Sequence, residues 1–374
     1  MDFSFTDEQE SIKELAGQIL GDACGHEHLS SLERDESGDG IDHGLWKLLA
    51  EAHLLGVAIE ESYGGSGLGL SSLYVLLEEA GRALAPVPLL ATLVYGALPI
   101  AEFGSPSQRK KWLPGVATGD TILTAALEEL GSRRPGEPHT KATADGDAWI
   151  LDGEKVCVPA ARAATRILVP ATTGPDRIGL FLVDPAAAGV EIEDDLANNY
   201  ERQGHLRLSG VRVEADDTLG DPLSGARSVQ WIVDRAQVAL AAMQLGLCQA
   251  ALERTAVYTA ERKQFDRAIG TFQAVTMRAA DAFVDLECMK STLWQAIWRL
   301  EENLPVTAEA ATAKWWACRG GSRVVHTTQH LHGGIGADID YPIHRYFLWA
   351  QQIGLTLGGA SEQLVRIGEE LAQA

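Results

Sequence analysis

The sequence predicts an α+β protein of several domains, in which a helical region, a β region and a second helical region follow one another. Apolar residues recur at helical spacing near both ends, whereas the middle holds short apolar runs separated by turn residues. Helical and β segments do not alternate, which argues against a parallel βαβ sheet. We therefore expect an N-terminal helical domain over residues 1–120, a middle antiparallel β barrel or sandwich over 121–222, and a C-terminal four-helix bundle over 223–374.

The N-terminal region carries the signals that begin and end helices. Thr6 is a candidate N-cap, with Glu8 and Gln9 in the first turn, and apolar residues then recur through IKELAGQIL. A second helix is expected in GLWKLLAEAHLLG, before the glycines of ESYGGSGLGL. Pro114 and Gly119 are expected to mark the boundary with the β region.

The β region contains runs such as AWILDGEKVCV, RILVPA and IGLFLVD, whose length and spacing are typical of antiparallel strands. Helical patterns return after residue 222. A long Ala-rich helix is expected over residues 226–264, followed by helices over about 273–302 and about 307–332. Such long helices are typical of a bundle.

Composition and charge restrict the kind of partner. The chain has 374 residues, of which 46% are hydrophobic, which is ample for a core. Its formal net charge of −21 argues against nucleic acid or an anionic membrane as the main partner, but not against a small anion held by a local basic cluster. The five scattered cysteines form no CxxC pair, which favours reduced thiols over a zinc site. The N-terminus lacks signal-peptide features and no segment could span a bilayer, so we expect a soluble cytoplasmic protein.

Two segments of the C-terminal region combine glycine with cationic, amide and aromatic side chains. One is AERKQFDRAIGTFQAV and the other is HLHGGIGADIDYPIHRYF. Together and in this order they resemble motifs of the acyl-CoA dehydrogenase family. The opening MDFSFTDEQ, the stretch LLGVAIEESYGGSGLGL and the order of the three regions are also similar to that family, so the resemblance covers nearly the whole chain.

The resemblance implies binding of FAD and α,β-dehydrogenation of an acyl-CoA, in which a carboxylate takes the α proton and the flavin accepts hydride. In the family, the first motif reaches a neighbouring subunit's FAD and holds its adenosine and diphosphate end. A guanidinium suits phosphate oxygens, amides donate hydrogen bonds, and glycines permit close backbone approach. The candidate cofactor-binding residues are Arg262, Gln264, Phe265, Phe272, Gln273, His330, Leu331, Gly333 and Gly334. The alternative is a solvated turn between helices with ordinary core phenylalanines.

The family's catalytic base has no counterpart at the expected positions. The family's C-terminal EGT corresponds to LTLGGASEQL, which places Leu357 or Gly358 at the base. In relatives whose base lies on the long preceding helix, the counterpart is Ala236. Asp234 is two helical residues away, roughly 200° around the axis, and is expected to be a solvated or paired surface carboxylate. Glu362 resembles a later, non-catalytic position, so no catalytic residue is assigned.

The middle domain also departs from the family. A stretch that contacts the flavin ring and substrate in the family, LTEP…GSD, is replaced by AALEELGSRRPG. The segment GEKVCVPAA places Cys157 and Pro159 where an aromatic residue and a Thr or Ser are usual. Proline has no backbone N–H to offer a flavin. Cys157 is expected to be a small buried apolar residue.

These departures lead to three hypotheses. In the first, the chain is the non-catalytic subunit of an α2β2 acyl-CoA dehydrogenase, resembling those that degrade steroid side chains in actinobacteria. A homologous subunit would carry the catalytic glutamate, and an electron-transferring flavoprotein would accept electrons. In the second, the chain is a self-sufficient homo-oligomer whose base is Asp234 or Glu362. In the third, it is a flavin-free scaffold.

Overall fold

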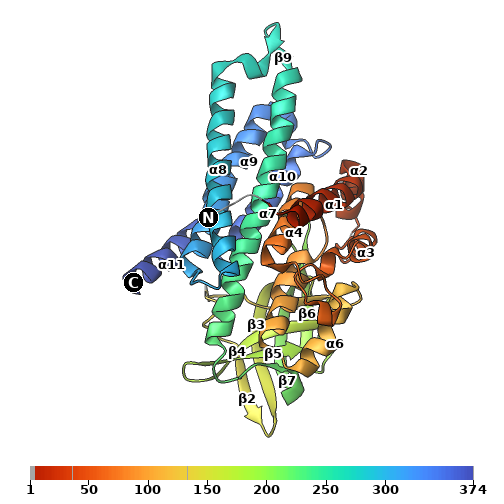
Figure 1. Cartoon of the computed structure of the whole chain (residues 1–374), viewed down its shortest axis with the longest axis vertical. Helices are drawn as coiled ribbons and strands as arrows, with labels where there is room; N and C mark the ends of the chain where they lie inside the picture. Colours follow the sequence, from red (N-terminus) through yellow and green to blue (C-terminus); the bar gives the residue numbers. More distant parts are fainter. Residues whose placement is uncertain (1–4, 36, 133, 374) are drawn as a thin grey trace. The chain divides into compact units, whose positions relative to one another are not determined.

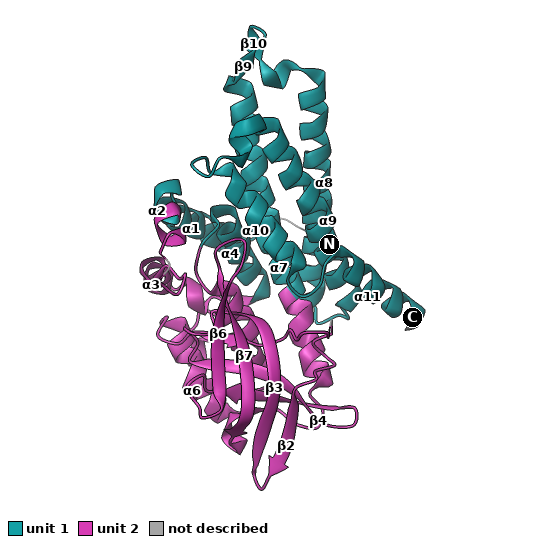
Figure 2. Cartoon of the chain, turned by 180° about the vertical axis from the view of Figure 1, so that it is seen from behind, with its two compact units in different colours: residues 1–29, 70–85, 237–374 teal, residues 30–69, 86–236 magenta. Residues whose placement is uncertain are grey.

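The computed structural model describes residues 5–35, 37–132 and 134–373. The chain forms two compact units that are discontinuous in sequence (Figure 2). The bundle unit comprises residues 1–29, 70–85 and 237–374, and the sheet unit comprises residues 30–69 and 86–236. No helix among the described residues combines the length and apolar character needed to cross a bilayer.

The N-terminal helices begin where their capping residues predict. Helix α1 (Asp7–Ala23) has Thr6 as its N-cap, and the side chains of Thr6 and Gln9 form the reciprocal hydrogen bonds of a capping box. Three further α-helices lie in the N-terminal region upstream of the π-helix η3 (Leu90–Ala97): α2 (His26–Glu33), α3 (His43–Glu51) and α4 (Gly69–Ala83). Short 3₁₀ turns at Leu54–Gly56 and Glu61–Tyr63 connect α3 to the glycine-rich segment before α4.

Of the two expected boundary residues, Pro114 lies inside a helix and Gly119 follows its end. Helices α5 (Leu98–Phe103) and α6 (Pro106–Ala117) follow η3, and Pro114 lies inside α6. Proline removes one helical hydrogen bond, but the Thr118 N–H still donates to the Pro114 carbonyl at 3.1 Å. Gly119, with a φ of +80°, then ends the segment.

The sheet unit is built around one mixed sheet whose strand order is β6-β7-β3-β2-β4-β5-β8, with β1 attached to β4. Most neighbours are antiparallel, as expected, but β1–β4 and β2–β4 are parallel. The strands are β1 (Leu123–Ala125), β2 (Lys141–Asp145), β3 (Ala148–Pro159), β4 (Arg166–Gly174), β5 (Arg177–Val183), β6 (Val190–Leu196), β7 (Arg202–Val213) and β8 (Thr218–Leu219). One face of these strands buries a core that includes Leu151, Val169 and Phe181.

A buried ion pair lies within this unit. The Lys155 ammonium is 2.6 Å from the Glu129 carboxylate, and both side chains are almost completely buried. The same carboxylate accepts hydrogen bonds from the backbone N–H groups of His139 and Thr140 and from the Thr140 hydroxyl. Burial alone would raise the pKa of Glu129, but the Lys155 charge and these hydrogen bonds outweigh it and lower that pKa.

The C-terminal helices are α7 (Ala226–Glu261), α8 (Gln273–Glu301), α9 (Thr307–His332), α10 (Ile343–Leu355) and α11 (Ala360–Gln373) (Figure 1). The first three match the expected ranges closely, and the predicted fold class is confirmed. The boundary between the two compact units falls within α7. In the bundle unit, α8, α10 and α11 pack on α9.

Helices α4 and α7 approach closely through glycine. A Cβ built at Gly81 would lie 2.0 Å from the Met243 carbonyl oxygen, and one built at Gly246 would lie 1.8 Å from the Glu78 carbonyl oxygen. Neither distance is possible for real atoms, and both obstacles are backbone. The absence of a side chain at these two positions is therefore required for the helices to pack as they do.

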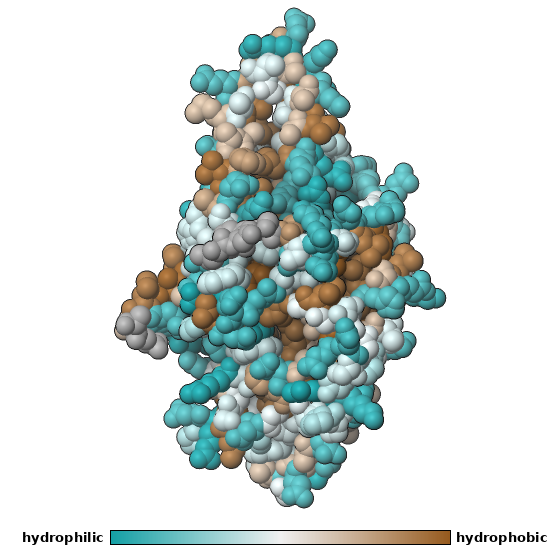
Figure 3. Space-filling model, viewed as in Figure 1, coloured by the Kyte–Doolittle hydropathy of each residue, from teal (hydrophilic) through white to brown (hydrophobic). Residues whose placement is uncertain are grey.

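Two helices of the bundle unit leave apolar side chains exposed. Along α8 these are Met277, Phe283 and Val284, and Figure 3 shows apolar surface in this part of the bundle unit. Along α11 they are Leu364, Val365 and Leu371. Exposed apolar faces on more than one helix are typical of surfaces that contact another protein.

We predict that Gly246→Ala lowers the free energy of unfolding by roughly 1–3 kcal/mol, because the new methyl group forces α4 and α7 apart. Urea unfolding of the full chain measures this change. Gly368→Ala on α11 is the matched control, since no atom lies within 4 Å of a Cβ there. An equally small change in both variants would contradict the close packing described above.

Glu129→Gln is expected to destabilise the chain by roughly 3–5 kcal/mol at neutral pH, because it leaves the buried Lys155 ammonium without a counter-charge. The exposed pair Arg212–Glu214 provides the control, and Glu214→Gln is expected to change stability by less than about 1 kcal/mol. Since folding lowers the pKa of Glu129, its contribution is present at neutral pH and is lost as the pH falls through that pKa. Urea unfolding at several pH values tests both statements.

Candidate functional site

The first motif forms a hairpin between α7 and α8. Strand β9 (Lys263–Gln264) pairs antiparallel with β10 (Arg267–Ala268), and Figure 1 shows the hairpin at one end of the α7–α8 pair. The two central residues, Phe265 and Asp266, have φ values of 53° and 64°. A two-residue turn of this kind requires positive φ at both positions. A bulky residue seldom adopts such a backbone, so the turn is strained at Phe265.

The side chains of this hairpin are directed to the surface. Phe265 is 88% exposed, and its ring contacts Phe272 edge-on at a centroid distance of 6.2 Å. The Arg267 guanidinium lies 4.0 Å above the Phe272 ring. Arg262 is exposed, and no described residue lies within hydrogen-bond or ion-pair distance of its guanidinium. An unpaired cation beside an exposed ring can recognise an anion that carries a flat apolar group.

The two glutamines of the motif differ in their surroundings. Gln264 is exposed, and its amide nitrogen donates to the Lys263 carbonyl at 2.7 Å. Gln273 is the first residue of α8 and is also exposed. Both amide groups can therefore reach a ligand at this surface, although Gln264 would first give up a local hydrogen bond.

The second motif places an open backbone at the end of α9. Gly333 follows the helix with a φ of 66°, and the 3₁₀ turn η6 (Gly333–Ala337) begins there. A Cβ at Gly333 or Gly334 would meet no atom within 4 Å. His330 is exposed, whereas the Leu331 side chain is buried. A ligand can thus approach His330 and the glycine backbone, but only the backbone of Leu331.

Tyr258 connects the two motifs. Its ring stacks on the His332 ring at 4.4 Å, and its hydroxyl is 3.4 Å from the His332 carbonyl. The Arg262 N–H donates to the Tyr258 carbonyl at 2.8 Å. His332 is buried, its Nδ1 lies 2.8 Å from the Thr328 carbonyl, and burial lowers its pKa. His332 is therefore a neutral residue that closes the helix end.

The expected base positions hold no carboxylate. Leu357 is buried with a φ of 56°, Gly358 has a φ of 93°, and Ala236 is fully buried. The polar group next to this turn is the amide of Gln363, which donates to the carbonyls of Leu357 and Gly358. The Gln363 amide oxygen accepts a 2.8 Å hydrogen bond from the Gln237 amide. An amide is not basic, so Gln363 itself cannot serve as a general base.

The two nearby carboxylates are held by local contacts. Asp234 is only 5% exposed and accepts a 2.7 Å hydrogen bond from Gln230 on the same helix, so the expected surface position is wrong, because α7 is packed on that side. Glu362 lies in the first turn of α11 and curls back, with Oε2 3.4 Å from a Cβ built at Gly359.

In the sheet unit, the expectation of a buried Cys157 is wrong. Cys157 is exposed with a φ of 53°, because the register between β3 and β7 shifts between Lys155 and Val158. Pro159 ends β3, and its carbonyl accepts a 2.8 Å hydrogen bond from the Thr124 hydroxyl. Position 159 therefore offers no backbone N–H, because it holds proline where the family has a Thr or Ser.

Acidic groups that the sequence patterns did not single out surround this region. Partial burial raises the pKa of the Cys157 thiol, as do the nearby carboxylates of Glu128, Asp195 and Glu201. The thiol is therefore protonated at neutral pH and a poor nucleophile. The Tyr95 hydroxyl is buried and has no hydrogen-bond partner among the described residues. Burial raises the pKa of Tyr95, and the carboxylates of Glu128 and Glu201 raise it further. No local sequence signal indicates this grouping, because it joins segments far apart in the chain.

Comparison with known proteins identifies the family. Residues 6–120 match the model of the acyl-CoA dehydrogenase N-terminal domain, and residues 224–371 match that of the C-terminal domain. The acyl-CoA dehydrogenase FadE27 of Mycobacterium tuberculosis is 37% identical over 381 residues, covering 100% of this chain and 99% of FadE27.

Two solved structures are similar over the whole fold. One, a Tcur3481–Tcur3483 steroid ACAD variant, has 48% identity, covers 98% of each chain and gives a TM-score of 0.92. The other, the ChsE4–ChsE5 complex of Mycobacterium tuberculosis, has 38% identity, covers 100% of each chain and gives a TM-score of 0.94. The resemblance on which the sequence interpretation rests is confirmed, and this chain belongs to the acyl-CoA dehydrogenase family.

Proposed function

We propose that this chain is the non-catalytic subunit of an FAD-dependent acyl-CoA dehydrogenase. It supplies the clamp for the adenosine diphosphate end of an FAD whose flavin ring is held by a homologous partner subunit. The partner contributes the catalytic glutamate. The observation that carries this proposal is the contrast between an exposed, unpaired Arg262 on the hairpin and the absence of a carboxylate at Leu357, Gly358 and Ala236.

The donor set at the hairpin suits a dinucleotide's diphosphate. Arg262 would hold phosphate oxygens with its forked N–H groups, and Gln264 and Gln273 would add amide hydrogen bonds. Phe265 and Phe272 would give apolar surface to the adenosine. The open backbone at Gly333 and Gly334 permits close approach, as a Cβ there would project into the space that a ligand would fill. His330 and the Leu331 backbone would complete the clamp.

The sheet unit does not suit the flavin ring or a thioester. At these two positions the family offers a flavin a backbone N–H and a flat aromatic surface. Pro159 lacks the N–H, and Cys157 lacks the flat surface. The carboxylates that raise the pKa of Cys157 would repel an anionic ligand. When bound to the complex, FAD supplies the hydride acceptor. This chain's residues bind and orient its phosphate end and remove no proton.

The nature of the relatives supports a heteromeric assembly. One of the similar structures is named as a complex of two proteins, and the name of the other joins two proteins and calls them a steroid ACAD. We infer that this chain forms an α2β2 heterotetramer that acts on an acyl-CoA ester of a steroid side chain. The exposed apolar faces of α8 and α11 offer surface for such contacts. An electron-transferring flavoprotein is the expected electron acceptor.

The self-sufficient alternative requires a base that the structure makes unfavourable. Asp234 is buried and hydrogen-bonded along its own helix, and Glu362 is folded back on its own turn. Either carboxylate would have to leave these contacts to reach a substrate. A flavin-free scaffold leaves the exposed Arg262 and Phe265 unexplained.

The purified chain is expected to contain little or no flavin and to oxidise no acyl-CoA. Co-expression with a homologous subunit encoded nearby should give both flavin absorbance and turnover, because each subunit completes the other's site. In that complex, Asp234→Asn and Glu362→Gln should leave turnover unchanged. Flavin-dependent turnover by the chain alone, abolished by either substitution, would refute the proposal and establish the homo-oligomer.

Arg262→Ala is expected to weaken FAD binding to the complex by roughly 1.5–3 kcal/mol, about tenfold to a hundredfold in dissociation constant, since phosphate oxygens lose charged donors. Flavin absorbance after gel filtration measures occupancy. Arg262→Lys, which keeps the charge but not the fork, should retain part of the affinity. The control is Arg319→Ala, because Arg319 is also exposed but lies on α9, outside the hairpin. Equal flavin content in the Arg262 and Arg319 variants would exclude the assigned role.

A further inference from the structure

An open cavity within the bundle unit takes no part in the clamp proposed above. It has a volume of about 720 Å³, which lies within the range of small-molecule pockets, roughly 300–1,000 Å³. Residues of α1, α4, α7 and α8 line it, and all of them belong to the same compact unit. The hairpin between α7 and α8 and the glycine turn after α9 contribute none of these residues. The cavity is therefore separate from the proposed FAD clamp.

Carboxylates outnumber cations in the lining of this cavity. Five glutamates and two cationic residues line it, namely Glu10, Glu14, Glu79, Glu253 and Glu287 against Lys13 and Arg82. Glu79 is buried, and the other four glutamates are exposed to solvent. Four carboxylates against two cations remain when Glu79 is left out. The negative excess therefore does not depend on the charge of Glu79, and it favours a cationic ligand over an anionic one.

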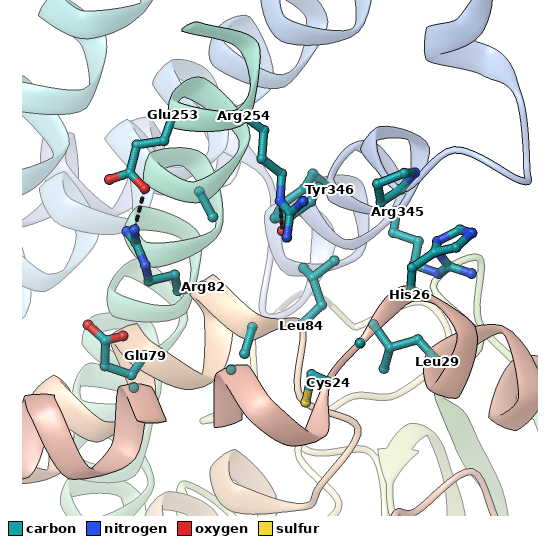
Figure 4. A pocket seen from close by; sticks show the side chains of 16 residues that line it. Cys24, His26, Leu29, Glu79, Arg82, Leu84, Glu253, Arg254, Arg345 and Tyr346 are labelled. Carbon is teal, nitrogen blue, oxygen red and sulfur yellow. Dashed lines mark hydrogen bonds and ion pairs between the residues drawn. The ribbon is translucent and has the colours of Figure 1, made fainter. Parts of the chain in front are cut away.

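The Glu79 carboxylate has no hydrogen bond and no ion pair with any described residue, although Glu79 is only 7% exposed. Arg82, on the same helix, is ion-paired with Glu253 instead. In the view of Figure 4 the Arg82 guanidinium lies between the two carboxylates, and the dashed line runs to Glu253. Burial raises the pKa of Glu79 although Arg82 and Lys13 lower it, as expected for a buried carboxylate without a close counter-charge. Since buried polar groups normally have partners, a donor from a ligand would complete this one.

An apolar surface lies beside these charges. Leu252 and Ala256 of α7 and Phe283 and Leu286 of α8 contribute it. Leu286 is buried, whereas Phe283 is 55% exposed, so that its ring is open to a ligand. Aromatic rings attract ammonium groups over their faces. A ligand that suits this arrangement carries a positive charge at one end and an apolar body of several carbon atoms.

We propose that this cavity is a binding site for a small organic ammonium ion. The ammonium group would donate hydrogen bonds to the Glu79 carboxylate, and the apolar body would lie against Leu252, Leu286 and the Phe283 ring. A bare metal ion is a poorer fit, because no group of three or more His, Cys, Asp or Glu side chains in the described part of the chain could hold one. The site does not rest on the function proposed above.

Isothermal titration calorimetry of the purified full chain tests this site with hexyl compounds that differ in their polar group. We expect n-hexylammonium to bind saturably and hexanol and hexanoate not to bind, because only the ammonium group can pair with Glu79. A comparison with 1,6-diaminohexane identifies the kind of amine. Tighter binding of the diamine indicates a polyamine, and weaker binding indicates a ligand with one charged end. Saturable binding of neither amine, or equal binding of hexanol, would overturn the proposal.

Two variants locate the binding. Glu79→Gln keeps the size of the side chain but removes its charge, and it should weaken n-hexylammonium binding about tenfold or more. Glu302→Gln removes the same charge from an exposed residue at the end of α8, outside the lining, and should bind like the wild type.

Ala256→Trp fills the cavity from an exposed position on α7 and should abolish binding while the protein stays folded. Its control is Gly368→Trp on α11, where no atom lies within 4 Å of a Cβ, and this variant should bind normally. Binding that survives both Glu79→Gln and Ala256→Trp would show that the cation lies elsewhere.

Discussion

The close packing of α4 against α7 is the constraint on which the bundle unit depends. Gly81 and Gly246 let the two backbones approach to a distance that any side chain would prevent. Helix α7 then carries the hairpin at one end and Tyr258 one turn before it. The position of one long helix therefore decides where the hairpin of the first motif lies.

The hairpin directs its side chains to the surface. A strained turn at Phe265 leaves its ring 88% exposed with an edge-on contact to the Phe272 ring, and the Arg267 guanidinium lies over that second ring. Such a surface suits a ligand held mainly by another molecule.

The turn after α10 keeps the architecture of the family, although the expected base positions hold no carboxylate. At the turn after α10, a glutamine amide satisfies the carbonyls of Leu357 and Gly358. The turn is stabilised because these carbonyls have a donor, and the amide that supplies it is not basic.

The sequence alone determined the helix starts, the order of the three regions and the family motifs, because capping residues, hydrophobic periodicity and glycine are local signals. Thr6 capped its helix as expected, and the absence of a carboxylate at Leu357, Gly358 and Ala236 could be read from single residues. Tertiary structure decided the rest. Pro114 stayed within a helix because its neighbours are buried, Cys157 was exposed because a strand pair shifted register, and Asp234 was buried by packing. The Tyr258–His332 contact and the glutamate-lined cavity join residues far apart in sequence, and no local pattern encodes which of them will meet.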